Sequence, residues 1–175
     1  MTPQQFIETY SPAAQEAQKA TAVPASITLA QAALESSWGA HVPGNNFFGI
    51  KPGKNWTGNL QFIDTTECGK TGNATKDGIF DEVTAIYPPG DPRHSPSCPG
   101  KYTYKVKSKF RAYDTPAESF SDHGNFLKNN HRYAACFETK SAADFASALQ
   151  KCGYSTAPNY AETLMQIIHA HNLEN

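Results

Sequence analysis

The chain has 175 residues, of which 39% are apolar and 18% are charged. This length and composition predict one globular domain that folds without metals or other staples, and they exclude a disordered or fibrous protein. Fifteen Lys and Arg residues balance 16 Asp and Glu residues, for a formal net charge of -1. The surface as a whole therefore has no electrostatic attraction for nucleic acid or anionic membrane. No apolar run has the length of a membrane span.

Helix signals mark the start of the chain. A helix is expected from residue 3 to about 20, because Thr2, Pro3 and Gln5 form a capping box ahead of it. A second helix is expected from Pro24 to a stop at Gly39. Its apolar residues share one stripe at helical spacing, and these are Ile27, Ala30, Leu34 and Trp38.

Residues from about 44 to 113 have a different pattern, in which dense Gly, Pro, Asn and Asp and short alternating segments predict hairpins and loops. In the last segment two sets of residues alternate and fall on opposite strand faces. The apolar set is Tyr102, Tyr104, Val106 and Phe110, and the basic set is Lys101, Lys105, Lys107, Lys109 and Arg111. We interpret the basic face as solvated surface, with a functional basic groove as the less favoured alternative.

Three further helices are expected in the last third of the chain. They begin at Thr115-Pro116, at Ser141 and at Pro158, and the last two end near Leu149 and His169. The sequence therefore predicts an α+β fold that is mainly α, with five or six helices and an inserted small β-region, as two lobes around one cleft.

Four cysteines form an even set without the closely spaced Cys or Cys/His pairs that mark zinc sites. They are Cys68, Cys98, Cys136 and Cys152. Pairing between sequence neighbours, Cys68 with Cys98 and Cys136 with Cys152, is the simplest prediction. Four free buried thiols are an equally open alternative for a chain without an export signal.

Glu35 is the first candidate for chemistry, because it follows a run of small and apolar side chains and precedes Trp38. Trp38 would lie on the same helical face and supply an apolar wall. Partial desolvation raises the pKa of a carboxyl, which is what a general acid needs near neutral pH. From spacing alone, a surface glutamate that ends a helix is an equally good interpretation.

The segment Asn45–Lys51 joins amides, aromatic rings, glycine and a lysine without periodicity, which predicts a shaped loop. Amides such as Asn46 can hydrogen-bond sugar substituents, and rings such as Phe48 can stack on pyranose rings. The same mixture also serves tight turns over a core.

Several blocks, in order, resemble the signatures of family 73 glycoside hydrolases, the endo-β-N-acetylglucosaminidases typified by the flagellar rod-cap muralytic domain. The blocks are Leu34–Gly39, Asn45–Lys51, Lys109–Tyr113, Gly153–Thr156, and Pro158 with Tyr160 and Ala161. The resemblance extends from about residue 3 to about residue 170.

This resemblance implies a lysozyme-like fold and a single glucosaminidase domain over residues 1–175, with the β-lobe inserted at about 44–113. It implies hydrolysis of the β-1,4 bond between N-acetylglucosamine and N-acetylmuramic acid in bacterial peptidoglycan. Glu35 falls on the family's acid and would protonate the leaving oxygen. We expect peptidoglycan glycan strands as the partner, and no cofactor, metal, nucleic acid or membrane.

The resemblance also implies a second acid in the β-lobe, after a Trp-x-Gly turn and a threonine-rich strand. Trp56-Thr57-Gly58 and then Asp64-Thr65-Thr66-Glu67 present that pattern. Glu67 is therefore the candidate that activates water or stabilises the cation, while assistance by the substrate acetamido group is an alternative. The competing nearby acids are Asp64, Asp77, Asp81 and Glu82.

Tyr154 matches the family's tyrosine near the cleft and joins the predicted catalytic set, and Tyr160 matches a second aromatic residue that positions the sugar. A tyrosine that only packs helices is the alternative for each. The other predicted substrate-binding residues are Trp38, Asn46, Phe48 and Lys51.

The sequence departs from the family between about Cys68 and Gly100, where a Gly- and Pro-rich insertion replaces a shorter hairpin. The insertion puts the placement of Glu67 in doubt. A lid, a partner-binding loop and tolerated loop length are all open interpretations.

Three other activities compete with this assignment. The first is a muramidase or lytic transglycosylase on the same fold. The second is a cysteine peptidase that pairs Cys136 with His123 or His131, although nothing recognisable surrounds these residues. The third is a glycan-binding module that has lost turnover, which the presence of both Glu35 and Glu67 argues against.

Delivery is a separate prediction. Met1–Phe6 lacks the basic and apolar regions of a secretory signal. We expect the chain as written to be made in the cytoplasm and to act in the periplasm or cell wall after export. A type VI-like secreted antibacterial effector with a cognate immunity protein that occludes the cleft fits this best. A phage lysin and a domain of a flagellar protein are the alternatives.

Overall fold

The computed structural model describes residues 1–79 and 81–174. The chain divides into two compact units, each of which is described by itself. The helical unit comprises Met1–Ile50 with Ala112–Asn175, and the sheet unit comprises Lys51–Arg111.

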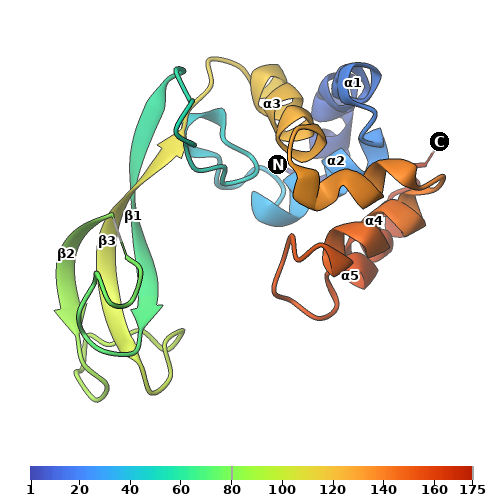
Figure 1. The fold of residues 1–175 in the computed structure, drawn as a ribbon. Helices are drawn as coiled ribbons and strands as arrows, with labels where there is room; N and C mark the ends of the chain where they lie inside the picture. Colours follow the sequence, from blue (N-terminus) through green and yellow to red (C-terminus); the bar gives the residue numbers. More distant parts are fainter. Residues whose placement is uncertain (80, 175) are drawn as a thin grey trace. The chain divides into compact units, whose positions relative to one another are not determined.

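The helical unit is built from five α-helices and two short 3-10 helices among its described residues (Figure 1). The α-helices are α1 (Pro3–Thr21), α2 (Ala25–Glu35), α3 (Pro116–Lys128), α4 (Ala142–Lys151) and α5 (Tyr160–Ala170), and the 3-10 helices are η1 (Pro43–Asn45) and η2 (His131–Glu138). None of the helices in the described part of the chain is both long and apolar enough to cross a membrane.

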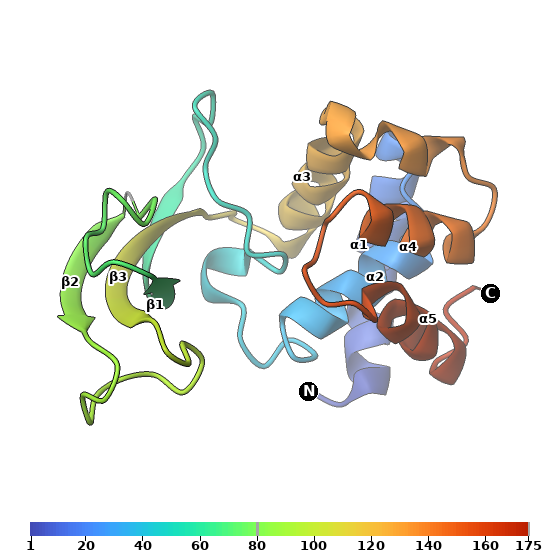
Figure 2. The same cartoon turned by 60° about the horizontal axis from the view of Figure 1, so that its bottom comes forward.

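Helix α2 is the central helix of this unit, and Figure 2 shows it among its neighbours. It packs against α1, α4 and α5, and every residue from 26 to 33 is buried. Ile27 and Ala30 belong to an apolar cluster with α4 and α5, whereas Leu29 and Ala33 belong to a second cluster with α1 and α3. The last two residues of the helix, Leu34 and Glu35, are exposed, so Glu35 lies where the helix leaves the core.

The helix starts follow the predicted capping signals. Thr2 Oγ1 accepts a hydrogen bond from the Gln5 N–H at 3.2 Å, and the Thr2 N–H donates to Gln5 Oε1 at 2.9 Å, which completes the capping box. Thr115 and Ser141 accept from backbone N–H groups three residues on, at 3.3 and 3.1 Å. Helix α5 begins at Tyr160, two residues after the predicted Pro158.

The predicted end of the second helix at Gly39 is wrong. Helix α2 ends at Glu35, because Ser37 and Trp38 adopt left-handed conformations with φ of 50° and 58°. The Trp38 N–H donates to the Ala33 carbonyl at 2.8 Å, and the Gly39 N–H donates to Ser36 Oγ at 2.9 Å, so the chain turns out of the helix. Trp38 therefore does not share a helical face with Glu35.

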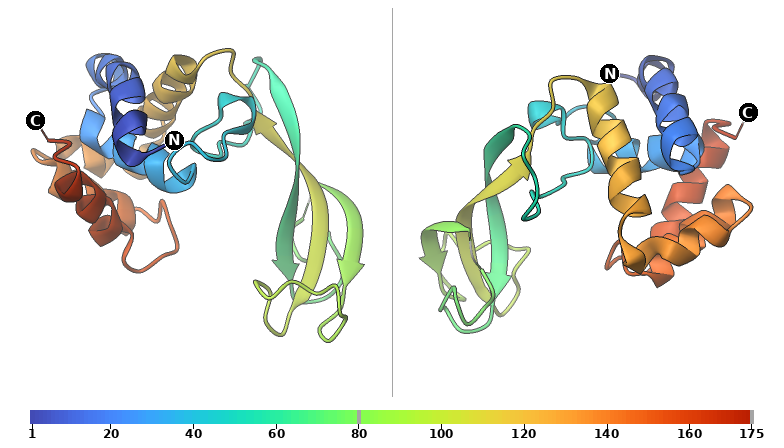
Figure 3. Two further views of the ribbon diagram at one scale, coloured as in Figure 1. Left: turned by 180° about the vertical axis from the view of Figure 1, so that it is seen from behind. Right: turned by 45° about the horizontal axis from the view of Figure 1, so that its top comes forward.

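The sheet unit is a three-stranded antiparallel sheet with strand order β1-β3-β2. Its strands are β1 (Leu60–Gly69), β2 (Glu82–Tyr87) and β3 (Tyr102–Arg111), seen from two further sides in Figure 3. The predicted alternation in β3 is confirmed: Tyr104 and Val106 are buried, and Lys105, Lys107 and Lys109 are exposed.

One disulfide joins Cys68, near the end of β1, to Cys98 in the loop before β3. This confirms the first predicted pair. The second predicted pair is wrong, because Cys136 and Cys152 are free thiols in the structure. The pKa of Cys136 is raised to about 12, mainly by burial and secondly by the neighbouring Cys152 thiol. Cys136 is therefore an inert core residue rather than a nucleophile.

Candidate active site

Glu35 is the last residue of α2, two positions after the buried segment that ends at Ala33. Its side chain reaches the surface, yet protein atoms surround the carboxyl closely enough that desolvation raises its pKa above 4.5. A carboxyl of this kind holds its proton to a higher pH than an ordinary glutamate does, and it can then deliver that proton to a leaving group.

Tyr154 and Tyr160 lie near Glu35 within the same unit. Their rings stack with centroids 5.6 Å apart and planes 26° apart. Burial raises the pKa of both phenols, and the charge of Glu35 contributes to both shifts. The helical unit thus brings Glu35, Tyr154 and Tyr160 together, with both phenols neutral and able to donate a hydrogen bond.

Behind these tyrosines lie two buried polar residues whose role the sequence interpretation missed. Gln31 Nε2 donates to Tyr160 Oη at 2.8 Å, and His123 Nε2 lies 3.4 Å from Tyr154 Oη. Burial lowers the pKa of His123 to about 3, so its imidazole is neutral. Gln31 is four residues before Glu35 on α2, so helical spacing could have placed it on the same face as Glu35. The sequence suggests His123 only as a candidate partner for Cys136.

The loop after η1 is shaped by Asn46. Its Oδ1 accepts from the Ile50 N–H and its Nδ2 donates to the Ile50 carbonyl, both at 3.0 Å. Phe48 is 7% exposed, and its ring stacks on His123 at 3.9 Å and meets Phe120 edge-on. These contacts give Asn46 and Phe48 a structural role in the loop. Contact of either side chain with sugar stays a prediction from residue type.

Trp38 packs into the helical unit instead of forming a wall on the helical face of Glu35. Its ring meets Phe6 edge-on at 5.6 Å and His171 at 4.8 Å. It is half-buried, and part of it remains accessible.

The remaining predicted site residues, Lys51 and Glu67, belong to the sheet unit. Glu67 is on β1, opposite Tyr104 in the register with β3. Lys51 Nζ lies 3.9 Å from Glu67 Oε1 and 3.0 Å from Asp81 Oδ2. Of the competing acids, Asp77 is committed to the fold, since it accepts hydrogen bonds from Tyr104 Oη and from the Lys70 and Thr71 N–H groups.

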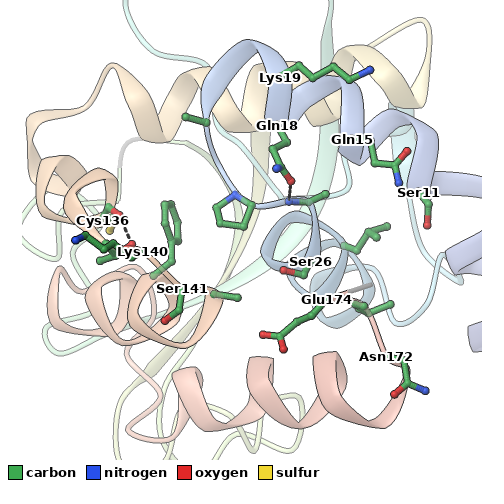
Figure 4. Close-up of a pocket in the computed structure, with 18 of the residues that line it drawn as sticks. Ser11, Gln15, Gln18, Lys19, Ser26, Cys136, Lys140, Ser141, Asn172 and Glu174 are labelled. Carbon is green, nitrogen blue, oxygen red and sulfur yellow. Dashed lines mark hydrogen bonds between the residues drawn. The ribbon is translucent and has the colours of Figure 1, made fainter.

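A separate hollow of about 720 Å³ is lined in part by Pro24, Ala25 and Ser26 at the start of α2, whereas Glu35 is the last residue of that helix. Figure 4 shows this hollow in close-up. Gln18, Ser26, Ser141 and Glu174 are among the polar residues around it. Gln18 Oε1 accepts a hydrogen bond from the Ala25 N–H at 2.6 Å, which satisfies a donor at the start of α2. Its described lining contains none of the predicted site residues, so we assign the chemistry to the Glu35 end of the helix.

The described elements form a mainly helical α+β domain with a small antiparallel sheet, and a carboxyl whose pKa is raised by burial ends the central helix. Comparison with known proteins identifies this domain as a glycoside hydrolase. Residues 11–173 match the glucosaminidase family, described as mannosyl-glycoprotein endo-beta-N-acetylglucosaminidase. The chain belongs to this family.

Relatives of known name agree with this assignment. The chain is 36% identical over 170 residues to the peptidoglycan hydrolase FlgJ of Escherichia coli K12, which covers 93% of this chain and 45% of that protein. It is 30% identical to the exo-glucosaminidase LytG of Bacillus subtilis, over 98% of this chain and 52% of that protein. The chain thus spans about half the length of these relatives.

Solved structures show the same fold. The glycoside hydrolase domain of Salmonella typhimurium FlgJ superposes with a TM-score of 0.70 at 32% identity, covering 99% of this chain and 91% of that one. A peptidoglycan hydrolase mutant from Sphingomonas sp. A1 gives a TM-score of 0.68 at 30% identity, covering 98% and 96% of the two chains.

Proposed function

We propose that this protein is a peptidoglycan hydrolase that cleaves the β-1,4 bond between N-acetylglucosamine and N-acetylmuramic acid, with Glu35 as the general acid. The observation that carries the proposal is the burial-raised pKa of the Glu35 carboxyl at the end of α2. Membership of the glucosaminidase family and the names of the relatives support the substrate class.

Glu35 would donate its proton to the glycosidic oxygen as the oxocarbenium-like transition state forms. Tyr154, a neutral phenol that the charge of Glu35 influences, would hydrogen-bond the reacting sugar. Tyr160 supports Tyr154 by ring stacking. Glu67 would supply the second carboxylate, which activates water or stabilises the cation.

A conservative substitution tests the role of Glu35. Glu35→Gln keeps the shape of the side chain and removes the transferable proton, so digestion of purified peptidoglycan should fall by at least about a hundredfold. Glu162→Gln, which changes an exposed glutamate on α5, is the matched control and should digest at the wild-type rate. Wall digestion by the Glu35→Gln variant at the wild-type rate would remove this mechanism.

Mass spectrometry of the products tests the bond. Reducing-end N-acetylglucosamine supports the proposal, whereas reducing-end muramic acid indicates a muramidase and anhydro-muramic ends indicate a lytic transglycosylase. Long glycan fragments support internal cleavage, while release of single sugars supports the exo mode in the name of the Bacillus relative.

We also propose that residues 1–175 form a single glucosaminidase domain that includes the sheet unit. The family match runs from residue 11 to residue 173 and includes both units. Limited proteolysis tests this: cleavage that separates a stable, active helical unit from the sheet unit would contradict it.

The place of action follows from the proposed substrate, which is the cell wall. The Cys68–Cys98 disulfide supports action in an oxidising compartment outside the cytoplasm. Among the delivery routes, the relatives favour a flagellar wall lysin over a secreted effector, since the FlgJ proteins of several species are similar to this chain. The effector with its immunity protein stays a prediction. Loss of motility in a deletion strain would support the flagellar role, and loss of killing of rival cells would support the effector.

A further inference from the structure

Three charged side chains of the sheet unit converge beside Glu67. Lys51 Nζ makes a hydrogen-bonded ion pair with Asp81 Oδ2 at 3.0 Å and a longer ion pair with Glu67 Oε1 at 3.9 Å. Among the described residues, Lys51 is the only cationic side chain within 4.0 Å of Glu67. The shorter distance indicates that Asp81 fixes the position of Lys51, and the longer one that Lys51 in turn acts on Glu67.

Asp81 is the fixed end of the arrangement. Ser108, which is fully buried on β3, donates to Asp81 Oδ2 at 2.7 Å, and Ser108 Oγ lies 3.1 Å from Thr65 Oγ1 on β1. Partial burial alone would raise the pKa of Asp81, but the hydrogen bonds from Ser108 and Lys51 outweigh it and lower the pKa. Asp81 therefore remains a carboxylate that anchors Lys51.

Strands β1 and β3 connect Asp81 with Glu67 through Ser108 and Thr65. Thr65 and Glu67 are two residues apart on β1, so their side chains lie on the same face of the sheet. Lys51 is constrained further by the ring of Phe110, whose centroid lies 5.5 Å from Nζ. The ammonium group is thus held by Asp81 and Phe110, and from there it faces the Glu67 carboxylate.

We propose that Lys51 and Asp81 are positioning residues that orient the Glu67 carboxylate, with Asp81 holding Lys51 and Lys51 holding Glu67. This inference rests on the proposed function, in which Glu67 is the second carboxylate. It changes the expected role of Lys51 from a substrate contact to a support for Glu67. The proposal also assigns a function to part of the insertion between Cys68 and Gly100, because Asp81 lies in that segment.

The ion pair of Lys51 with Glu67 contributes little to folding, because both side chains are exposed. The side chains of Lys51 and Glu67 are 50% and 44% exposed, and exposed ion pairs contribute little to stability. Substitutions of Lys51 should therefore leave the melting temperature almost unchanged, so their effects on catalysis can be measured on folded protein.

The test is a double-mutant cycle with soluble, uncross-linked peptidoglycan strands as substrate. Lys51→Met should lower kcat by about tenfold or more with KM nearly unchanged, because a misplaced carboxylate costs turnover rather than binding. Lys51→Arg keeps a cation beside Asp81 and should restore most of the activity. Asp81→Asn should lower kcat less than Lys51→Met does. Lys109→Met, an exposed lysine of β3, is the matched control and should behave as wild type.

The decisive comparison is made in the Glu67→Gln background, where Lys51→Met should cause no further loss if it acts through Glu67. Losses that multiply, or a rise in KM alone, would overturn the inference and return Lys51 to a substrate contact. Full activity of Glu67→Gln would also overturn it, together with the role of Glu67. Glu35→Gln, measured in parallel, reports separately on the proposed function as a whole.

Discussion

Gln31 and Tyr160 are joined by a hydrogen bond that spans 129 residues of sequence, from the amide Nε2 on α2 to the phenol oxygen on α5 at 2.8 Å. Both side chains are buried. Gln31 Oε1 has no hydrogen-bond partner among the described residues. The bond to Tyr160 is therefore the one that orients the side-chain amide of Gln31. It ties the helix that ends in Glu35 to the tyrosine pair beside it.

Removal of the phenol oxygen should therefore destabilise the helical unit. Tyr160→Phe leaves Gln31 Nε2 buried without its acceptor, at a cost of about 1–3 kcal/mol in the free energy of unfolding. Replacement of both partners, Gln31→Leu with Tyr160→Phe, should recover part of the loss because no orphaned amide remains. Urea denaturation of the two single variants and the double variant measures the coupling, and strictly additive losses would contradict it.

The raised pKa of Glu35 predicts a pH-dependent cost to stability. The folded protein binds the Glu35 proton more tightly than the unfolded chain does. The resulting stabilisation is therefore fully present below the unfolded pKa near 4.5 and is lost as pH rises through the higher folded pKa. Above that window the native state holds a partly desolvated carboxylate, which Glu35→Gln does not.

Glu35→Gln should thus melt at a higher temperature than the wild type at pH 8, with a smaller difference at pH 4. Calorimetry of both proteins across this range measures the effect, and Glu162→Gln serves as the control for loss of an exposed carboxylate. A difference in melting temperature that is constant with pH would show that burial does not raise the pKa of Glu35.

The local signals in the sequence predicted the parts of the fold that depend on local chemistry. Helix starts at Thr2, Thr115 and Ser141 were predictable because each cap bonds a backbone N–H three residues away. The two faces of β3 were predictable because side chains alternate along any strand.

The remaining features depend on contacts between distant residues. The end of α2 was misplaced because the left-handed turn falls on Ser37 and Trp38, whereas glycine is the usual residue for such a turn. The role of His123 was missed because its partners, Phe48 and Tyr154, come from other parts of the chain. The ion pair of Lys51 with Asp81 joins residues 30 apart in sequence, and no spacing rule predicts such a pair.

The disulfide should stabilise the sheet unit. Cys68 and Cys98 are 30 residues apart, and closing a loop of that length lowers the entropy of the unfolded chain by an amount worth about 3–4 kcal/mol. The Cys68→Ser and Cys98→Ser double variant should lose up to that much. Hydrogen exchange should show the loss as faster exchange in β1 and β3, with α2 little affected. Cys152→Ser, which removes a free thiol, is the control, and equal protection of β1 in both variants would contradict the prediction.

Gly124 on α3 leaves no room for a side chain beside Thr21 of α1. A Cβ at this position would lie 2.5 Å from Thr21 Oγ1 and 2.7 Å from Thr21 Cγ2. Thr21 cannot easily yield, because it is buried, β-branched and donates from Oγ1 to the Ala17 carbonyl at 2.7 Å. The gain in helix propensity from glycine to alanine is about 1 kcal/mol, whereas overpacking costs about 1–3 kcal/mol.

Gly124→Ala should therefore lower the free energy of unfolding by up to about 2 kcal/mol, the steric cost less the propensity gain. Asn125→Ala, at the next position on α3 and exposed to solvent, is the matched control and should be neutral or slightly stabilising. Thr21→Ala combined with Gly124→Ala removes both atoms of the closest contacts and should cost less than the sum of the single changes. Urea denaturation measures all four variants. A Gly124→Ala variant as stable as Asn125→Ala would show that α1 and α3 can separate at no cost, and that the short contact at Thr21 does not limit their packing.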